Sequence, residues 1–595
     1  MSIVVKAQIK DAIFEVIGVS EVALETPENA DFGDYSTNVA MQLFSDIKSG
    51  KAESGVPEKY LHAKSPRELA EMIVFSLKGD KELKKLVDRV EIAGPGFINF
   101  FLTRFNLVNE LEKVLGKGRV YGTSAVLKGK RVMVEFGQPN THKLPHIGHL
   151  FSYIYGESIA RLLKSQSAEV FRANYQGDVG PHVAKCLWAY LEEKPDVPDS
   201  LIGKAILLQE MYVIGSTAYG ADENSKKEID EINRKIYAFD ESIQPVWEET
   251  RQWSIDYYKQ FEERLGIAYD RYFYESEVFK EGLNIVQGNV GKVFKESEGA
   301  VIFEGSKYGL HDRVFVTSQG TPTYEAKDMY LQTLKMKEWP CDLLIITTAH
   351  EQNEYFNVIF KALELLNPDF KNKLVHIGFG MVNLKEGKMS SRTGQIVGGV
   401  ELVNTVIDAI ASMLADKKDL KVDMASAISE IVGMGATKYS FLKNNPLQDT
   451  KFDINESISK EGNSGPYLQY TYARTQSVLR KANTFKGGSL QNKLKTEDGK
   501  LKTENFNADE FGIMRTLIHY PEVVQEAAEK YAPNIVCTYL YALAQKYNTF
   551  YNSNRILNPE EGEEVKKFRL VLTLAVGQVL KNGLDLLGVE APEKM

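Results

Sequence analysis

Hydrophobic and polar residues follow a mixed helix and strand pattern in the first part of the chain. Residues 1–18 carry apolar side chains at helical spacing, interrupted by lysine, aspartate and glutamate. Further on, the apolar runs 90–93 and 97–102 flank a Gly-Pro-Gly turn, which is typical of two neighbouring strands. We therefore expect an N-terminal α+β domain over residues 1–115.

From residue 131 the pattern changes to alternating strands and helices. A β-branched run at 131–136 precedes a helical segment at 149–166 and a second strand at 168–175, which is the order of a βαβ unit. Further elements follow, with strands at 300–305, 313–318, 342–349 and 374–384 and a helix at 353–366. We expect one doubly wound, Rossmann-type α/β domain over residues 116–400 that holds all these strands, with a charge-rich helical insertion at 190–265.

Helical periodicity dominates the last third of the chain. No strand pattern is evident after residue 401, so we expect an all-α helical-bundle domain over residues 401–595. A polar, lysine- and glycine-rich stretch at 116–130 separates the first two domains. The predicted fold class is therefore multidomain: α+β, then α/β, then all-α.

Composition narrows the class of protein. The chain has 595 residues, of which 43% are hydrophobic and 26% charged, a balance typical of a folded protein of several domains. Its three cysteines are far apart and lack metal-ligand spacing, so we expect neither a disulfide framework nor a protein-bound zinc ion. No stretch approaches the roughly 18 consecutive apolar residues of a membrane span, which predicts a cytoplasmic protein without a membrane partner. The net charge of −9 argues against a broad nucleic-acid surface but leaves a local basic groove open.

The first candidate site lies at the start of the helix that follows the strand at 131–136. His146 and His149 are three residues apart, so both imidazoles lie on one side of the first helical turn, where backbone N–H groups and the helix dipole favour an anion. Gly148 leaves room for a flat base or a phosphate near the backbone. A nucleotide triphosphate suits this site best, although a metal-binding pair or two surface histidines have the same spacing.

The second candidate site is a glycine-bounded loop at 387–394. It contains Lys388, Ser390, Ser391 and Arg392, that is, two cations and two hydroxyls. Cations on such a loop neutralise the charge that develops on a departing pyrophosphate. A basic, serine-rich loop alone is usually a solvated turn, and only its combination with the two histidines makes the pattern specific.

Together the two sites, HIGH at 146–149 and KMSSR at 388–392, resemble the two signatures of class I aminoacyl-tRNA synthetases. Further stretches resemble the arginyl-tRNA synthetase family over essentially the whole chain: 32–43, 93–102, 134–150, 172–180, 270–278, 320–331, 462–475 and 586–595. The resemblance implies an enzyme that activates L-arginine with ATP and Mg²⁺ and transfers it to tRNA(Arg), as a monomer whose activation step requires bound tRNA. A second HIG sequence at His376 lacks the partner histidine and lies in a strand pattern, so we interpret it as structural.

The resemblance also assigns an arginine-binding set. A guanidinium group carries five donors and no acceptor, so its pocket needs carboxylates, carbonyls and hydroxyls. By resemblance Asp328 binds the guanidinium, with Tyr324 one helical turn earlier and Gln352 beside it. The set that holds the α-amino and carboxyl end comprises Glu135, Asn140 and His146.

One position departs from the family pattern. Ser391 stands where the second signature usually has a lysine, and losing that cation raises the barrier to pyrophosphate departure. Lys143, three residues before His146, is at the family position that supplies this charge, so we expect it to act with His146, His149 and Lys388 in catalysis.

The resemblance implies two further sets of contacts. ATP contacts fall on His146, Gly148, His149, Lys388, Ser390 and Ser391, with backbone groups of Met381 and Val382 at the adenine. The tRNA contacts fall on Phe32 and Asn38 in the N-terminal domain and on Tyr467, Arg474, Asn552, Arg555 and Met595 in the C-terminal domain.

Two rival hypotheses stay open from the sequence. Ser391 is compatible with a non-catalytic tRNA-binding paralogue, although such a protein has no need to retain His146, His149, Lys143 and Lys388 together. A class I synthetase for another amino acid shares the two signatures and differs in the pocket around Asp328.

Overall fold

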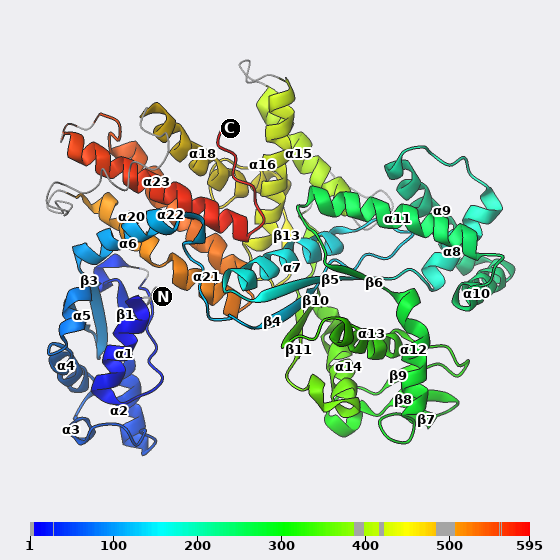
Figure 1. Cartoon of the computed structure of the whole chain (residues 1–595), viewed down its shortest axis with the longest axis horizontal. Coiled ribbons are helices and arrows are strands. Elements are labelled where there is room, and N and C mark those ends of the chain that lie inside the picture. Colours follow the sequence, from blue (N-terminus) through cyan, green and yellow to red (C-terminus); the bar gives the residue numbers. More distant parts are fainter. Residues whose placement is uncertain are drawn as a thin grey trace.

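The computed structural model describes residues 5–27, 29–385, 398–415, 422–482, 506–558, 560 and 562–595. These residues form an N-terminal α+β domain, a central α/β domain and a C-terminal all-helical domain (Figure 1). The predicted fold class is confirmed. Among the described residues, no helix is both long and apolar enough to cross a membrane.

The N-terminal domain packs helices against a three-stranded antiparallel sheet in the order β1-β3-β2. Its strands are β1 (Tyr35–Thr37), β2 (Val87–Ala93) and β3 (Phe97–Leu102). Its helices are α1 (Val5–Ile17), α2 (Val39–Ser49), α3 (Glu58–Leu61), α4 (Pro66–Leu77) and α5 (Lys81–Leu86), and α6 (Arg104–Lys117) follows. The expected pair of strands around the Gly-Pro-Gly turn is β2 and β3.

The central domain contains a five-stranded parallel sheet in the order β6-β5-β4-β10-β11. Its strands are β4 (Arg131–Glu135), β5 (Glu169–Gln176), β6 (Arg271–Tyr274), β10 (Leu343–Ala349) and β11 (Leu374–Phe379). Its helices are α7 (Ile147–Ser165), α12 (Glu275–Gly288), α13 (Tyr324–Glu338) and α14 (Asn353–Leu366). Numbered along the chain this order is 3-2-1-4-5, so the sheet changes direction between β4 and β10, where doubly wound sheets bind ligands.

Two of the strands expected in this sheet lie elsewhere. The runs at 300–305 and 313–318 form β8 (Ala300–Phe303) and β9 (Arg313–Val316). With β7 (Lys295–Ser297) they make a separate antiparallel sheet in the order β7-β8-β9. Our placement of them in the doubly wound sheet is wrong, because a short apolar run does not specify its partner strand.

The helices between β5 and β6 form a lobe at the right of Figure 1. They are α8 (Pro181–Glu193), α9 (Leu201–Ala221), α10 (Glu223–Ala238) and α11 (Gln244–Arg264). We call α9, α10 and α11 the insertion helices.

The C-terminal region is almost entirely helical. Its helices are α15 (Gly399–Ala415), α16 (Val422–Leu442), α17 (Ile454–Ser457), α18 (Gly465–Lys481), α20 (Ala508–Ile518), α21 (Tyr520–Glu529), α22 (Pro533–Ser553) and α23 (Glu563–Leu586). One short strand, β13 (Thr450–Phe452), corrects the expectation of no strands after residue 401; it pairs in parallel with β12 (Val382–Leu384). A three-residue strand is too short to leave a sequence pattern.

Helix α7 joins the parallel sheet to the C-terminal helices. Buried residues lie on all its faces, as expected for a helix packed between two layers rather than at a surface. Its close approach to β4 requires a glycine at 156, because a Cβ there would lie 2.2 Å from the Cβ of Phe136. This packing fixes the N-terminus of α7 relative to the end of β4.

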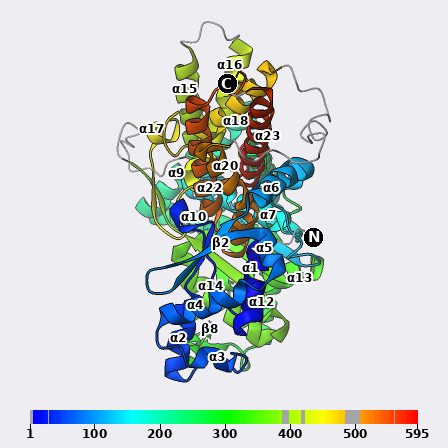
Figure 2. The ribbon, with the colours of Figure 1, turned by 90° about the vertical axis from the view of Figure 1, so that its left-hand side faces the viewer.

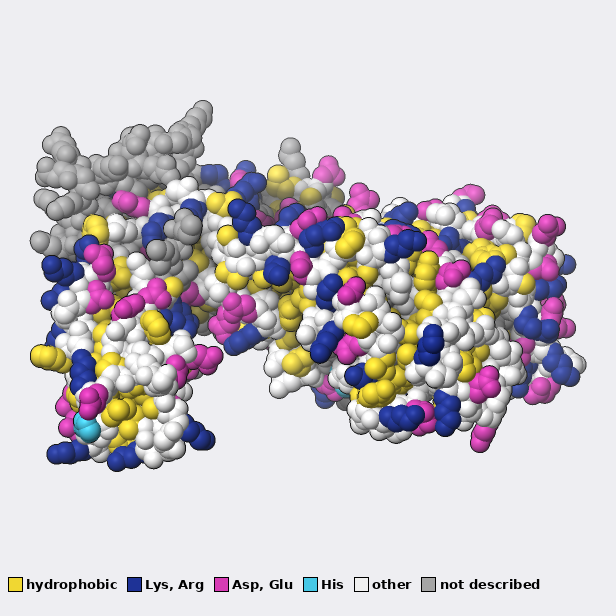
Figure 3. Space-filling model, turned by 60° about the horizontal axis from the view of Figure 1, so that its bottom comes forward, with side chains coloured by type: hydrophobic (Ala, Val, Ile, Leu, Met, Phe, Trp, Pro, Cys, Tyr) yellow, Lys and Arg dark blue, Asp and Glu magenta, His cyan; other side chains and the backbone are white. Residues whose placement is uncertain are grey.

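The N-terminal domain stacks beneath the C-terminal helices on one side of the molecule (Figure 2). The Tyr35 hydroxyl donates to Glu522 at 2.7 Å, and Arg515 lies 3.1 Å from Asp34 across this contact. The space-filling view shows the domain as a separate lobe, with basic and acidic side chains interspersed over the same face (Figure 3).

Candidate active site

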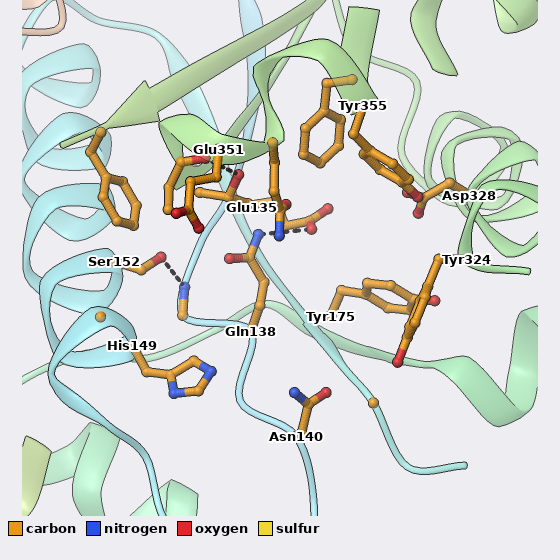
Figure 4. A pocket seen from close by; sticks show the side chains of 18 of the residues that line it. Glu135, Gln138, Asn140, His149, Ser152, Tyr175, Tyr324, Asp328, Glu351 and Tyr355 are labelled. Carbon is orange, nitrogen blue, oxygen red and sulfur yellow. Dashed lines mark hydrogen bonds between the residues drawn. The ribbon is translucent and has the colours of Figure 1, made fainter. Parts of the chain in front are cut away.

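A cavity of about 680 Å³ opens at the carboxyl ends of β4 and β10, where the sheet changes direction. Figure 4 shows His149 at one end of the pocket and Asp328 at the other. The lining residues come from strands β4, β5, β9, β10 and β11, from helices α7, α12, α13 and α14 and from the loops between them. They include predicted site residues: Glu135, Asn140, His146, Gly148, His149, Tyr324, Asp328 and Gln352.

The two histidines cap the N-terminus of α7. Nδ1 of His146 accepts from the backbone N–H of Gly148 at 3.1 Å, and Nδ1 of His149 accepts from the backbone N–H of His146 at 3.2 Å. The rings stack with centroids 3.8 Å apart. Because each Nδ1 is an acceptor, each neutral ring carries its proton on Nε2 and presents it as a donor.

The histidines are held neutral. Burial, and then the positive charge of Lys143, lower the pKa of His146. Burial, followed by His146 and Lys143, lowers the pKa of His149 well below its ordinary value. Two neutral N–H donors at a helix N-terminus form a site for an anion.

Lys143 lies on the loop that leads into this helix. Its Nζ sits 4.1 Å from the centroid of the Tyr212 ring on α9. The Tyr258 hydroxyl of α11 donates to the carbonyls of Asn140 and Lys143, both at 2.6 Å. The insertion helices therefore hold the loop that carries Lys143.

Asp328 is a buried carboxylate on α13 at the far end of the pocket. The Tyr355 hydroxyl donates to its Oδ2 at 2.5 Å. Burial raises the pKa of the Asp328 carboxyl to about 7. Tyr324 is 53% exposed at the start of α13, and Gln352 is exposed just before α14. The structure thus brings these three predicted residues to one end of the cavity.

Glu135 ends β4 and is paired within the protein. Lys335 of α13, itself fully buried, donates to its Oε2, and the Gln138 amide donates to its Oε1 at 3.0 Å. The Asn140 side chain lies over Gly177, where a Cβ would come within 2.2 Å of Oδ1. Both predicted residues line the cavity beside β4.

Sequence reasoning missed several polar residues of this site, and three of them bear directly on the predicted set. Glu275 lines the pocket and pairs with Lys327 at 2.8 Å. Lys335 donates a hydrogen bond to Glu135, and Tyr355 donates one to Asp328. Glu275 follows β6 directly, and the rule that ligands bind at carboxyl ends of parallel strands would have found it; the other two lie within helices and leave no local signal.

The second signature falls outside the described residues, and so do Lys388, Ser390 and Ser391. The strand leading to it is described. The Met381 N–H donates to Asp449 at 2.7 Å, and the Met381 carbonyl accepts from Thr450 at 2.8 Å. In a parallel pair, successive residues turn their backbone N–H and C=O groups to opposite sides of the strand. The backbone groups of Met381 therefore face β13, and those of Val382 face away from it. The second HIG sequence lies in β11, with the His376 ring stacked on Phe356 at 4.3 Å.

The predicted tRNA-binding residues of the C-terminal domain lie on or near its helices. Arg474 on α18 contacts the rings of Tyr470 and Tyr551 at 4.9 and 4.7 Å. Tyr467 on the same helix is half-buried against Tyr541.

Three predicted residues of this domain and two of the N-terminal domain complete the set. Asn552 and Arg555 are exposed at the end of α22, whereas Met595 packs against the α15–α16 core. Phe32 is 51% exposed, and Asn38 is half-buried at the start of α2.

A parallel sheet of this order, with paired histidines at the switch point and a helical lobe between β5 and β6, defines the catalytic domain of a class I aminoacyl-tRNA synthetase. The family profile for "tRNA synthetases class I (R), catalytic domain" matches residues 110–454. Profiles for the "Arginyl tRNA synthetase N terminal domain" and the "DALR anticodon binding domain" match residues 4–102 and 468–595. The chain belongs to the arginyl-tRNA synthetase family.

Curated relatives agree with this assignment, and a solved structure shares the fold. The arginine--tRNA ligase of Treponema denticola is 33% identical over 97% of this chain and 95% of its own length, and that of Parabacteroides distasonis is 33% identical over 78% and 80%. The Thermus thermophilus arginyl-tRNA synthetase structure is similar in fold, with a TM-score of 0.78, 23% identity and 99% of each chain covered. The chain is therefore an enzyme, an ATP-dependent aminoacyl-tRNA ligase.

Proposed function

We propose that the chain joins L-arginine to tRNA(Arg) through an arginyl-adenylate, releasing pyrophosphate and then AMP. One observation carries this proposal: a single cavity holds a buried carboxylate at one end and two neutral imidazole donors at the other. ATP enters as its magnesium complex, because Mg²⁺ binds phosphate oxygens in preference to protein cages. The enzyme acts as a monomer.

The amino acid lies between Asp328 and β4. Asp328 and Glu275 face the guanidinium with carboxylate oxygens, and Tyr324 and Gln352 close the exposed side. Fork-shaped pairing of a guanidinium with carboxylates is strong and directional. At the other end Glu135, Asn140 and His146 hold the α-amino and carboxyl groups near the start of α7.

ATP lies along the N-terminus of α7. The arginine carboxylate attacks the α-phosphorus in line, and the bond to the pyrophosphate oxygen breaks. His146 and His149 donate Nε2–H bonds to phosphate oxygens beside Gly148, and Lys143 and Lys388 balance the charge of the departing pyrophosphate, with Ser390 and Ser391 on the same loop. Val382 holds the adenine through its backbone. Catalysis is positioning and electrostatics.

The second step uses tRNA as acceptor. A hydroxyl of its terminal adenosine attacks the mixed anhydride, so that the aminoacyl ester forms and AMP leaves. We assign the anticodon stem and loop to the C-terminal helices, where Tyr467, Arg474, Asn552, Arg555 and Met595 lie. Phe32 and Asn38 contact the corner of the tRNA.

Charging of tRNA tests this proposal. Purified full-length chain is incubated with ATP, unfractionated tRNA and one radiolabelled amino acid at a time. We expect arginine alone to become acid-precipitable with the tRNA. Charging with another amino acid would overturn the assignment of the pocket, and tRNA binding without any charging would favour a non-catalytic paralogue.

The pKa of Asp328 predicts the pH dependence of arginine use. Because its carboxyl has a pKa of about 7 and only the ionised form pairs with a guanidinium, kcat/KM for arginine falls as pH drops below about 7, toward tenfold per pH unit. Initial rates at limiting arginine between about pH 6 and pH 8 measure this. At saturating arginine the inflection moves to lower pH, since bound guanidinium stabilises the carboxylate. A flat profile at limiting arginine would contradict the assignment.

A further inference from the structure

The environment of Lys143 differs from that of the other lysines at the site. Lys335 pairs with Glu135 and Lys327 pairs with Glu275, so each of those charges is neutralised by a carboxylate. Within the described ranges, no carboxylate lies within ion-pairing distance of the Lys143 Nζ. Its neighbour is Tyr212: the Nζ lies 4.1 Å from the ring centroid, and, against the effect of burial, Ser216 and this ammonium lower the pKa of the Tyr212 hydroxyl.

An aromatic face and a carboxylate hold a lysine with different consequences. A carboxylate cancels the charge and competes with an incoming anion. A ring attracts the ammonium through its quadrupole and leaves the full positive charge available. A lysine that must receive a phosphate is therefore better held by a ring.

The backbone of the loop around Lys143 forms hydrogen bonds with two of the insertion helices, α9 and α11. The backbone N–H of Leu144 donates to Gln209 on α9, and that of His142 donates to Ser254 on α11, both at 2.9 Å. The backbone at His142 is in the left-handed region, with φ +63°. Because these hydrogen bonds fix the backbone of His142 and Leu144, the position of the Lys143 ammonium depends on the conformation of its side chain. The contact with Tyr212 restricts that conformation.

The charge so held reaches the histidines. After burial, the positive charge of Lys143 lowers the pKa of His146, and at His149 it adds to the effects of burial and of His146. Its field therefore acts at the N-terminus of α7, where the phosphates lie in the proposed function.

We propose that Tyr212 is a positioning residue, which holds the ammonium of Lys143 beside the paired histidines in a cation–π contact without neutralising it. The proposal rests on the proposed function of Lys143 in pyrophosphate departure. The insertion helices then take part in arginine activation through the aromatic ring of Tyr212 on α9.

A double-mutant cycle tests the proposal. The readout is arginine-dependent ATP–pyrophosphate exchange in the presence of unfractionated tRNA, with kcat and the KM for ATP measured separately. Tyr212→Leu is expected to lower kcat/KM for ATP by about tenfold, the size of a cation–π contact. Tyr212→Phe keeps the ring face and is expected to stay within about threefold of the wild type. In the Lys143→Ala variant, the additional change Tyr212→Leu is expected to lower kcat/KM for ATP by less than about twofold.

The chain offers a matched control on the same helix. Lys185 on α8 lies 4.4 Å from the ring centroid of Tyr219 on α9, another cation–π pair away from the pocket. Tyr219→Leu is expected to leave exchange unchanged. Equal losses from Tyr212→Leu with and without Lys143, or equal losses from the two tyrosine variants, would overturn the proposal. Absence of exchange in the wild type would instead overturn the proposed function.

Discussion

Asp328→Asn is expected to increase the KM for arginine by a factor between about thirty and several thousand, with the KM for ATP nearly unchanged. The carboxylate is buried, and the Tyr355 hydroxyl already occupies one of its oxygens. Asparagine keeps the shape but loses the charge, and removing one partner of a buried, hydrogen-bonded ion pair costs about 2–5 kcal/mol. Steady-state exchange kinetics with arginine and ATP varied in turn measure both constants.

A carboxylate on the same helix provides the control. Glu338 ends α13 and pairs with Arg271 at 3.2 Å, outside the pocket. Glu338→Gln is expected to leave both KM values close to those of the wild type. An Asp328→Asn enzyme with an unchanged KM for arginine would show that the guanidinium binds elsewhere.

His149→Asn is expected to slow adenylate formation by about 10²–10³-fold, while the KM for arginine changes little. The neutral imidazole offers its Nε2–H to charge that develops on the phosphates, and loss of one such preorganised donor costs about that factor in kcat. Asparagine retains an acceptor for the His146 N–H, so the start of α7 stays capped. Single-turnover formation of arginyl-adenylate with tRNA present measures the effect.

An exposed histidine serves for comparison. His311 lies at the surface and pairs with Glu354 at 2.9 Å. His311→Asn is expected to preserve the rate. If His149→Asn kept the wild-type single-turnover rate, the paired histidines would have no part in phosphate stabilisation.

The sequence predicted best those parts of the site that depend on local spacing. His146 and His149 share one helical turn whatever surrounds it. The preceding strand places that turn at the carboxyl ends of the strands. The three-domain order was predictable for the same reason, because long periodic segments reveal their own type.

Contacts between distant segments could not be predicted in this way. Lys335 is 200 residues from Glu135, and Tyr212 reaches Lys143 from an inserted helix. No periodicity records such pairs, since they form only when the sheet and the insertion pack together. The placement of β8 and β9 failed similarly, because strand pattern specifies an element but not its partner. The roles of the arginine-binding and tRNA-binding residues came from the family resemblance alone.

The most direct test of the central claim is ATP–pyrophosphate exchange with a panel of amino acids, with and without unfractionated tRNA. We expect exchange with arginine only, and only when tRNA is present. This result would support the pocket, the phosphate site and the tRNA requirement together. Exchange with another amino acid, or none with any amino acid despite tight tRNA binding, would contradict the account.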